Sequence, residues 1–444
     1  MARIHNSVLR LSVVALLAVS GLAISSVASA ACTGPTNTCF GTFVLGKNTT
    51  GTWNTGIGFS ALAANTTGLS NTASGANALG KNISGADNTA IGSAALYENT
   101  TGRYNTAIGS VALVKNIDGK SNTASGFAAL KSNTAGNYNT ANGAGALELN
   151  IIGSSNTASG AAALNRNSSG GSNTASGMQA LNRNSSGSAN TAVGVNALYN
   201  NTTGEFNTAS GAGALALNIG GRRNTASGAN SLANTSSGYR NVALGYGAGY
   251  SVTGSDNIVI GAENYGVAAE NGVIRIGISA YQKRAFIAGI RGAQTGATGA
   301  VAVLIDANGQ LGTISSSRRF KEDIQPMGSV SERLFALRPV SFRYKQPYED
   351  GSKPVQYGLV AEEVAEVFPE LVVYGKDGKP ETVAYHVLAT LLLNELQKEH
   401  RVVQALRQDN EVQAARMAAL EQQVAILAQA VERADKSRMV ASTR

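Results

Sequence analysis

Ser316 and Lys321 are five residues apart in the stretch SSRRFKEDI, where the chain changes from weakly to densely charged. A serine hydroxyl is a weak nucleophile until a neighbouring base takes its proton. A lysine serves as that base only when its amine is neutral, and burial together with nearby cations such as Arg318 or Arg319 lowers a lysine pKa toward that state. The pair could therefore perform nucleophilic chemistry, although by residue type alone a solvated polar loop is the more ordinary interpretation.

The acidic side chains of the preceding segment do not predict a second active site. A solenoid enzyme that hydrolyses glycosidic bonds needs two carboxylates close together. The acidic residues here occupy different positions of the repeat described below, so stacking does not gather them on one face: Asp87, Glu98, Asp118, Glu148 and Glu205. Two cysteines are too few for a metal site, and we predict no metal and no cofactor.

The net charge gives little support to nucleic-acid binding. It is +8 at pH 7 and falls to +6 if Arg3 and Arg10 are removed with an N-terminal signal. Nucleic-acid recognition favours clustered Lys and Arg with interleaved aromatic residues. The nearest approaches are the pairs Arg222-Arg223 and Arg318-Arg319, which make no basic stripe. We expect no nucleic-acid partner.

Residues 1–30 are typical of a cleaved signal peptide. Arginines precede the apolar run 11–24, and Ala28-Ser29-Ala30 supplies small residues for cleavage. The run is shorter than the roughly 20 residues of a spanning helix, so a membrane anchor is the less favoured alternative. We expect a secreted or cell-surface protein with no integral membrane segment after signal removal. In an oxidising compartment Cys32 and Cys39 could form a disulfide.

An asparagine recurs every 17 residues from Asn37 to Asn241, in units that read N-T-A-x-G-x-x-A-L-x-x-N-x-x-G-x-x. So strict a period predicts one structural unit per repeat, and two glycines in each unit argue against continuous helix. The unit suits one coil of a β-solenoid, with a strand at NTASG, a second strand or a single helical turn at ANAL, and turns at NTTG. Stacking would put Leu on Leu in a narrow interior and Asn on Asn in a ladder of amides.

Threonine occupies position two of the repeat from Thr38 to Thr225. A flat ladder of threonines could order water, which would indicate ice binding. The interpretation that we favour is that these threonines point inward or pair within the ladder.

The predicted solenoid covers residues 31–256, and the period breaks after Asn257. Residues 257–315 contain short apolar runs divided by glycines and by the turn signal Asn308-Gly309, which predict a β-rich connector of hairpins. Residues 316–385 alternate helical and strand patterns and predict a small α+β domain, with a hairpin that turns at 376–378.

Residues 386–434 predict one long helix that forms a coiled coil, followed by a disordered tail at 435–444. The a positions of its heptads hold Ala389, Val403, Asn410, Met417, Val424 and Val431, and the seam is completed by Leu392, Leu396, Leu406, Leu420 and Leu427. Such a seam predicts an oligomer, and Asn410 would fix its register. Valine at a with leucine at d leans towards dimers without settling the number of chains.

Four stretches in order resemble the intramolecular chaperone and autoprocessing domain at the end of phage endosialidases and tail fibres, the peptidase S74 family: SSRRFKEDI, RPVSFRYK, YGLVAEEVAEVFPELV and VAYHVLATLLLNEL. The resemblance covers Ser316 to about Leu406. It implies a domain that trimerises its chain, helps the upstream β-structure to fold, and then cuts itself off immediately before a serine.

The resemblance also assigns residues. It implies that Ser316 is the nucleophile, Lys321 the general base and Ser315–Ser316 the scissile bond of a serine endopeptidase that acts once on its own chain. The family usually has aspartate after the serine, where this chain has Ser317. Ser317 as a rival nucleophile and a domain without the cleavage step are therefore open alternatives.

Two further residues belong to the GLVAEEV motif of the same domain. For Gly358 and Glu363, a turn glycine and a helix-surface carboxylate are as good an interpretation as a role in assembly.

The repeat NTAIGSAALYENTTG resembles, more loosely, the head repeats of trimeric autotransporter adhesins. Together the two resemblances imply a fibre-like or adhesin-like homotrimer, bacterial or phage-derived, with a cell-surface or glycan ligand. The alternative is an extracellular carbohydrate-active or ice-binding solenoid with a trimerisation domain that does not cleave.

Overall fold

The computed structural model describes residue 32, residues 34–288, and residues 290–442 except for 291–295, 297, 307, 308 and 376. The expected signal peptide, residues 1–30, lies outside the described residues. The chain divides into two compact units, Met1–Ile287 and Ala288–Arg444, which are described one at a time.

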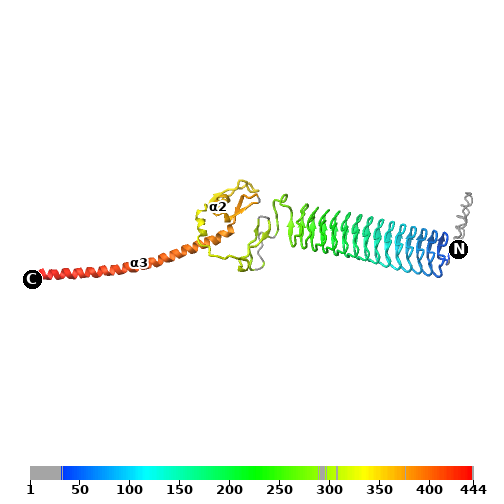
Figure 1. Ribbon diagram of the computed structural model, residues 1–444, viewed down its shortest axis with the longest axis horizontal. Coiled ribbons are helices and arrows are strands. Elements are labelled where there is room, and N and C mark those ends of the chain that lie inside the picture. Colours follow the sequence, from blue (N-terminus) through cyan, green and yellow to red (C-terminus); the bar gives the residue numbers. More distant parts are fainter. Residues whose placement is uncertain are drawn as a thin grey trace. The chain divides into compact units, whose positions relative to one another are not determined.

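The repeats of the first unit form one parallel β-sheet of 15 strands, stacked in chain order as successive rungs (Figure 1). Each residue lies on the residue at the same repeat position of the next coil, as Thr89 on Thr106 and Ala90 on Ala107. The predicted fold class is confirmed: the chain is mostly β, with a β-solenoid of 17-residue repeats, small sheets towards the C-terminus and a C-terminal helix. The strands are β1 (Thr38–Phe40), β2 (Thr55–Ile57), β3 (Thr72–Ser74), β4 (Thr89–Ile91), β5 (Thr106–Ile108), β6 (Thr123–Ser125), β7 (Thr140–Asn142), β8 (Thr157–Ser159), β9 (Thr174–Ser176), β10 (Thr191–Val193), β11 (Thr208–Ser210), β12 (Thr225–Ser227), β13 (Val242–Leu244), β14 (Ile258–Ile260) and β15 (Ile274–Ile276).

Alanine and leucine fill the interior of the coils. The alanines at positions three and eight and the leucine at position nine are fully buried, as in Ala107, Ala112 and Leu113. Each buried leucine contributes roughly 2 kcal/mol of hydrophobic stabilisation. Because one leucine and two alanines fill a coil, the solenoid needs few large side chains, which explains why aromatic residues make up only 6% of the chain.

Two ladders of buried asparagines run along the coils, one at position one and one at position twelve. Asn139 Nδ2 donates to Asn122 Oδ1 at 3.1 Å and to the carbonyl oxygen of Gly153 at 2.9 Å. Asn150 Nδ2 donates to Asn133 Oδ1 at 2.8 Å and to the same Gly153 carbonyl at 2.9 Å. Both ladders thus hydrogen-bond to the second glycine of the coil. The ladder amides pair with one another, except that Asn218 Oδ1, at the end of the position-twelve ladder, has no partner.

The backbone requires glycine at positions five and fifteen. A Cβ on Gly153 would lie 2.4 Å from Asn150 Oδ1, and Gly143 has a φ of +136° that L-residues rarely adopt. Leucine at position nine also takes a left-handed conformation, with φ 49° at Leu164. The expected second strand or helical turn is therefore wrong: this segment is a chain of turns, although Leu164 N–H still donates to the Ala180 carbonyl of the next coil at 2.9 Å.

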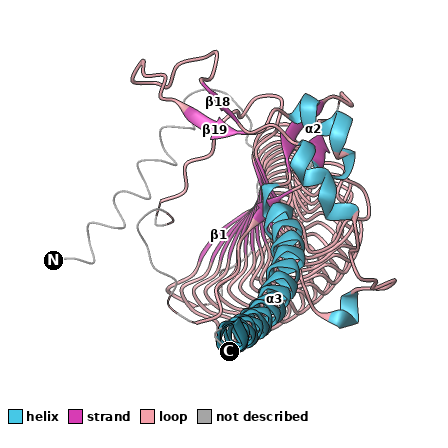
Figure 2. Ribbon diagram, turned by 90° about the vertical axis from the view of Figure 1, so that its left-hand side faces the viewer, coloured by secondary structure: helices cyan, strands magenta, loops and turns pink. Residues whose placement is uncertain are grey.

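The strands lie along one side of the coils (Figure 2). In β8 and in most other strands the first and third residues are exposed or half-exposed and the middle alanine is buried. The threonines at position two therefore point outward, and the first of our two expectations, that they point inward, is wrong. Side chains alternate between the two faces of a strand. Because the alanine at position three points into the coil, the threonine at position two must point to solvent.

The parallel sheet continues beyond residue 256. Strands β14 and β15 pair in parallel with the preceding coil, Ile258 on Val242 and Ile274 on Ile258, with a step of 16 residues. The hairpin expected at GVIRIG is therefore wrong. At the other end of the rod the structure joins Cys32 and Cys39 in a disulfide beside the first coil.

The second unit contains three antiparallel strand pairs and a small core. The pairs are β16 (Leu304–Ile305) with β17 (Leu311–Gly312), β18 (Val340–Phe342) with β19 (Gln356–Gly358), and β20 (Val372–Tyr374) with β21 (Pro380–Val383). The first and third pairs are hairpins as expected, and residues 308 and 376 at their turns lie outside the described part.

Short helices complete the second unit: the 3₁₀ helices η2 (Arg318–Phe320), η3 (Val330–Ala336) and η4 (Pro369–Leu371), and the α-helix α2 (Ala361–Val367). The core gathers Val364, Phe368, Leu371, Val372, Val383 and Leu391.

The last element is the helix α3 (Tyr385–Ser442), 58 residues long. It continues through 435–442, so the disordered tail expected there is wrong. Among the described residues, no helix combines the length and apolar character needed to cross a membrane.

Candidate functional site

The segment that carries Ser315, Ser316 and Lys321 lies on the surface of the second unit. Ser315 to Ser317 have no regular secondary structure, and the Ser317 N–H donates to Ser315 Oγ at 3.3 Å. The helix η2 follows and ends where the Lys321 N–H donates to the Arg318 carbonyl at 3.1 Å. Every residue from 311 to 326 is exposed.

Ser316 and Lys321 are not joined in the single chain. Within the described residues, no side-chain hydrogen bond connects the Ser316 hydroxyl with the Lys321 amine or either group with another side chain. Lys321 is exposed, so it lacks the burial that favours the neutral amine. The folded monomer thus supplies neither the contact nor the burial that a serine–lysine pair needs for catalysis.

Gly358 lies at the end of strand β19, against Tyr385 at the start of α3. A Cβ at Gly358 would lie 2.8 Å from the Tyr385 hydroxyl oxygen. That oxygen also accepts a hydrogen bond from the Leu359 N–H at 2.9 Å. Gly358 therefore allows the close approach of α3 to β19 and does not occupy a turn.

Glu363 lies on α2 and forms a bidentate ion pair with Arg338. Arg338 Nε donates to Glu363 Oε2 at 3.1 Å, and its Nη2 donates to the other carboxylate oxygen at 2.5 Å. This hydrogen bonding raises the pKa of Arg338. The pair ties α2 to the segment before β18, which is a structural role.

A polar cluster that the sequence patterns did not reveal fixes α3 to η3. Ser331 is fully buried, and its hydroxyl donates to Glu395 and accepts from Asn394 Nδ2, the latter at 2.6 Å. Lys398 Nζ donates to Glu395 Oε1 at 2.8 Å and to Glu332 at 2.9 Å. The hydrogen bonds from Lys398 and Ser331 lower the pKa of the Glu395 carboxyl. In the sequence, the only feature that could have indicated this cluster is the polar pair Asn394-Glu395, which follows an apolar run.

Beyond this cluster α3 carries an exposed apolar stripe. Five side chains of the predicted seam are 57–64% exposed: Leu406, Leu420, Val424, Leu427 and Val431. Met417, Leu420, Val424 and Ala428 line a shallow hollow on the same side of the helix. A stripe of this kind on a long helix is typical of a surface that another helix covers.

The exposed serine–lysine segment, the small α+β core and the helix docked onto it define one domain. Residues 316–373 match the family described as chaperone of endosialidase, Peptidase_S74. This match confirms the resemblance on which the site residues depend. Neither the search of curated proteins nor the search of solved structures found a match.

The chaperone domain, as residues 316–373 are called from here on, begins at the expected nucleophile Ser316 and contains Lys321, Gly358 and Glu363. The roles of Ser316 and Lys321 stay predictions, because the match gives the family and not the chemistry of the individual residues. The helix α3 lies outside the matched residues.

Proposed function

We propose that this chain is a secreted, fibre-like or adhesin-like structural protein whose chaperone domain drives trimeric assembly and is then released by cleavage between Ser315 and Ser316. The observation that carries the proposal is the succession of a rod of nearly identical coils, a chaperone domain that begins at Ser316, and a helix with an exposed apolar stripe.

The structure of the rod gives a reason for an attached chaperone. Consecutive coils present the same buried alanines, leucine and asparagines to each other, so a strand paired one coil out of place loses little packing energy. A nucleus at the C-terminal end would bring several chains together in one register before the rod forms. The exposed seam of α3 supports an oligomer, and the family resemblance supports three chains.

The proposed cleavage is an acyl transfer within the chain. The Ser316 Oγ attacks the Ser315 carbonyl carbon while neutral Lys321 takes the hydroxyl proton. The C–N bond then breaks, the amino nitrogen of Ser316 receives a proton, and the Ser315 carbonyl is left as an ester on Ser316 Oγ. Water hydrolyses that ester and releases a fragment that ends at Ser315.

Assembly would supply what the single chain lacks. Both side chains are exposed in the monomer, and neighbouring chains packed around α3 would bury Lys321 and place it against Ser316. Cleavage should therefore follow oligomerisation and depend on protein concentration.

Intact mass of the purified chain tests the proposal, beside Ser316→Ala, Lys321→Ala and Ser317→Ala. Fragments that meet at Ser315–Ser316 in the wild type and in Ser317→Ala, and in neither other variant, are the expected result. A wild-type protein that is oligomeric but uncut would support the assembly role and contradict the peptidase role. A monomeric wild type would overturn both.

The outward threonines support a second candidate, binding to ice. Twelve threonines from Thr38 to Thr225 share position two, and those of neighbouring strands lie directly on each other on the solvent face. Thermal hysteresis of the purified protein tests it, with Thr157→Lys and Thr174→Lys as variants. Freezing-point depression that these variants abolish would support ice binding, and no depression in the wild type would exclude it.

A further inference from the structure

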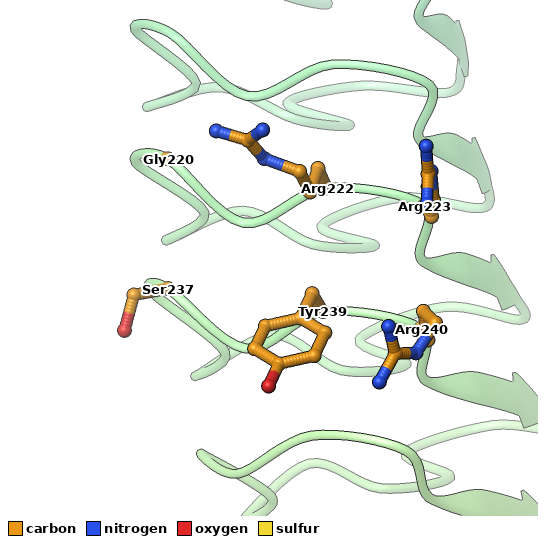
Figure 3. Close-up of a pocket in the computed structure, with 6 residues that line it drawn as sticks. All are labelled: Gly220, Arg222, Arg223, Ser237, Tyr239 and Arg240. Atoms are coloured by element: carbon orange, nitrogen blue, oxygen red, sulfur yellow. The ribbon is translucent and has the colours of Figure 1, made fainter.

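A surface pocket of about 470 Å³ lies on two consecutive coils near the C-terminal end of the rod (Figure 3). It is lined by Gly220, Arg222, Arg223, Ser237, Tyr239 and Arg240, which we call the arginine pocket. Three guanidinium groups and one phenol ring thus gather beside a sheet whose other outward residues are mostly small and uncharged.

The register of the solenoid assembles the pocket. Residues 17 apart lie on each other, so Tyr239 follows Arg222 at position sixteen and Arg240 follows Arg223 at position seventeen. The Arg240 N–H donates to the Arg222 carbonyl at 3.1 Å, which holds the two coils together at this point. Arg223 and Arg240 both have left-handed backbones, with φ 58° and 56°, so the turn that directs their side chains is repeated in the two coils.

The three arginines differ in their partners. Arg240 is already neutralised: its Nη2 lies 3.0 Å from Asp256 Oδ2, its Nε lies 2.5 Å from the other oxygen, and its guanidinium lies 4.7 Å from the ring centre of Tyr239. Within the part of the chain that the structure describes, the guanidinium groups of Arg222 and Arg223 form no hydrogen bond or ion pair. Figure 3 shows the Arg222 side chain extending on the side of Gly220, away from the ring of Tyr239 on the next coil.

We propose that the arginine pocket binds the anionic groups of an acidic polysaccharide. Planar guanidinium groups form paired, charge-assisted hydrogen bonds with carboxylates, and Arg222 and Arg223 have these donors available. Tyr239, held in place by Arg240, offers an aromatic surface and a hydroxyl to a sugar ring, and Ser237 offers a second hydroxyl. Carboxylated and sulfated chains share this chemistry.

The surroundings limit the ligand to a chain with spaced charges. Glu205 occupies position sixteen of the coil before Arg222, and Asp256 follows Arg240, so carboxylates bound the pocket along the rod in both directions. A densely charged polyphosphate backbone would meet these carboxylates, whereas a polysaccharide with one charge on each sugar would not. The pocket therefore does not suit nucleic acid.

The test measures binding of the full chain to polygalacturonate and to chondroitin 4-sulfate by calorimetry, with neutral dextran as the negative control. The double variant Arg222→Gln/Arg223→Gln should weaken binding about tenfold or more, since each lost charge-assisted bond costs a large factor in affinity. Tyr239→Ala should also weaken binding, and Glu205→Gln should strengthen it. Raising the salt concentration should weaken binding of the wild type.

Arg166→Gln is the matched control, because it removes one positive charge from an exposed arginine at position eleven, at another place on the rod. Binding to polygalacturonate alone would identify a carboxylated ligand, and binding to chondroitin 4-sulfate alone a sulfated one; either supports the proposal. No binding to either chain, equal binding to dextran, or equal losses in the Arg166 and double variants would overturn it. Because the pocket lies in the rod, oligomer size and cleavage should be unchanged in every variant, which separates this test from that of the assembly role.

Discussion

At the scale of single residues, the rod depends on side chains that satisfy one another in rows. Within a ladder an asparagine such as Asn139 donates to the preceding coil and accepts from the next, so one missing amide leaves groups unpaired on both sides. The exposed threonines of the strands have no such dependence, because their hydroxyls face water. Burial, and not residue type, therefore decides which polar side chains stabilise a coil.

Asn139→Ala should lower the free energy of unfolding by about 2 kcal/mol, because the Asn156 backbone N–H and side-chain amide lose their common acceptor in a buried site. Urea denaturation followed by circular dichroism measures the change. The adjacent exposed residue supplies the control: Thr140→Ala should change the free energy by less than about 0.5 kcal/mol. Equal effects of the two substitutions would show that the ladder is not a source of stability.

Gly358→Ala should destabilise the chaperone domain by about 1 kcal/mol, since the new methyl group would lie 2.8 Å from the Tyr385 hydroxyl. Removing that hydroxyl in Gly358→Ala/Tyr385→Phe should recover part of the loss. Thermal unfolding of the four proteins measures both effects. A double variant less stable than the sum of the two single changes would contradict the packing role of Gly358.

At the scale of elements, α3 has two different parts. Its first turns pack on the domain core through Leu391 and on η3 through Glu395 and Lys398, whereas its later turns present leucines and valines to solvent. One end of the helix is therefore fixed by contacts within the chain. The other end is available to further chains.

The docking of η3 on α3 should weaken in acid. The folded pKa of Glu395 is lowered, chiefly by the hydrogen bond from Lys398 and then by that from Ser331, so its stabilisation is present above the unfolded pKa, about 4.3 for a glutamate. It is lost as the pH falls from that value through the folded pKa. Glu395→Gln should be less stable than wild type at pH 7 and should lose less stability between pH 6 and about pH 3. Thermal unfolding over this range is the measurement, and parallel pH profiles would contradict the assignment.

Leu420→Asn should dissociate the proposed oligomer, because it places an amide in the middle of the exposed apolar stripe of α3. Sedimentation velocity measures the size of the assembly. Gln422→Asn, two residues further along and outside the predicted seam, should leave it unchanged. An oligomer that survives Leu420→Asn would mean that α3 does not hold the chains together.

At the scale of the whole molecule, the two units pose different folding problems. The rod consists of contacts that repeat every 17 residues, which makes each coil depend mainly on its neighbours. The second unit has a small hydrophobic core of its own, which the chaperone domain forms together with Val383 and Leu391. A repeat protein can begin to fold at many points, and a separate nucleus would select one.

Deletion of residues 316–444 should therefore yield a rod that aggregates or pairs out of register. Soluble yield, size-exclusion chromatography and hydrogen exchange along the coils measure this outcome. The full chain with Ser316→Ala, which keeps the chaperone domain attached, is the control and should fold. A truncated rod that is soluble and protected like the control would contradict the chaperone role.

The solenoid could be predicted from the amino-acid pattern, because Asn, Leu and Gly recur at fixed positions and a fixed period indicates a stack of equal units. The sequence also located the chaperone domain and its Ser316 and Lys321. The side of the strand that the threonines face could not be predicted in this way, because the alternation depends on which neighbouring residue fills the interior of the folded coil. The separation of Ser316 from Lys321, the Ser331–Glu395 cluster and the arginine pocket were also visible only in the folded structure. They depend on distances between segments that no local sequence pattern encodes.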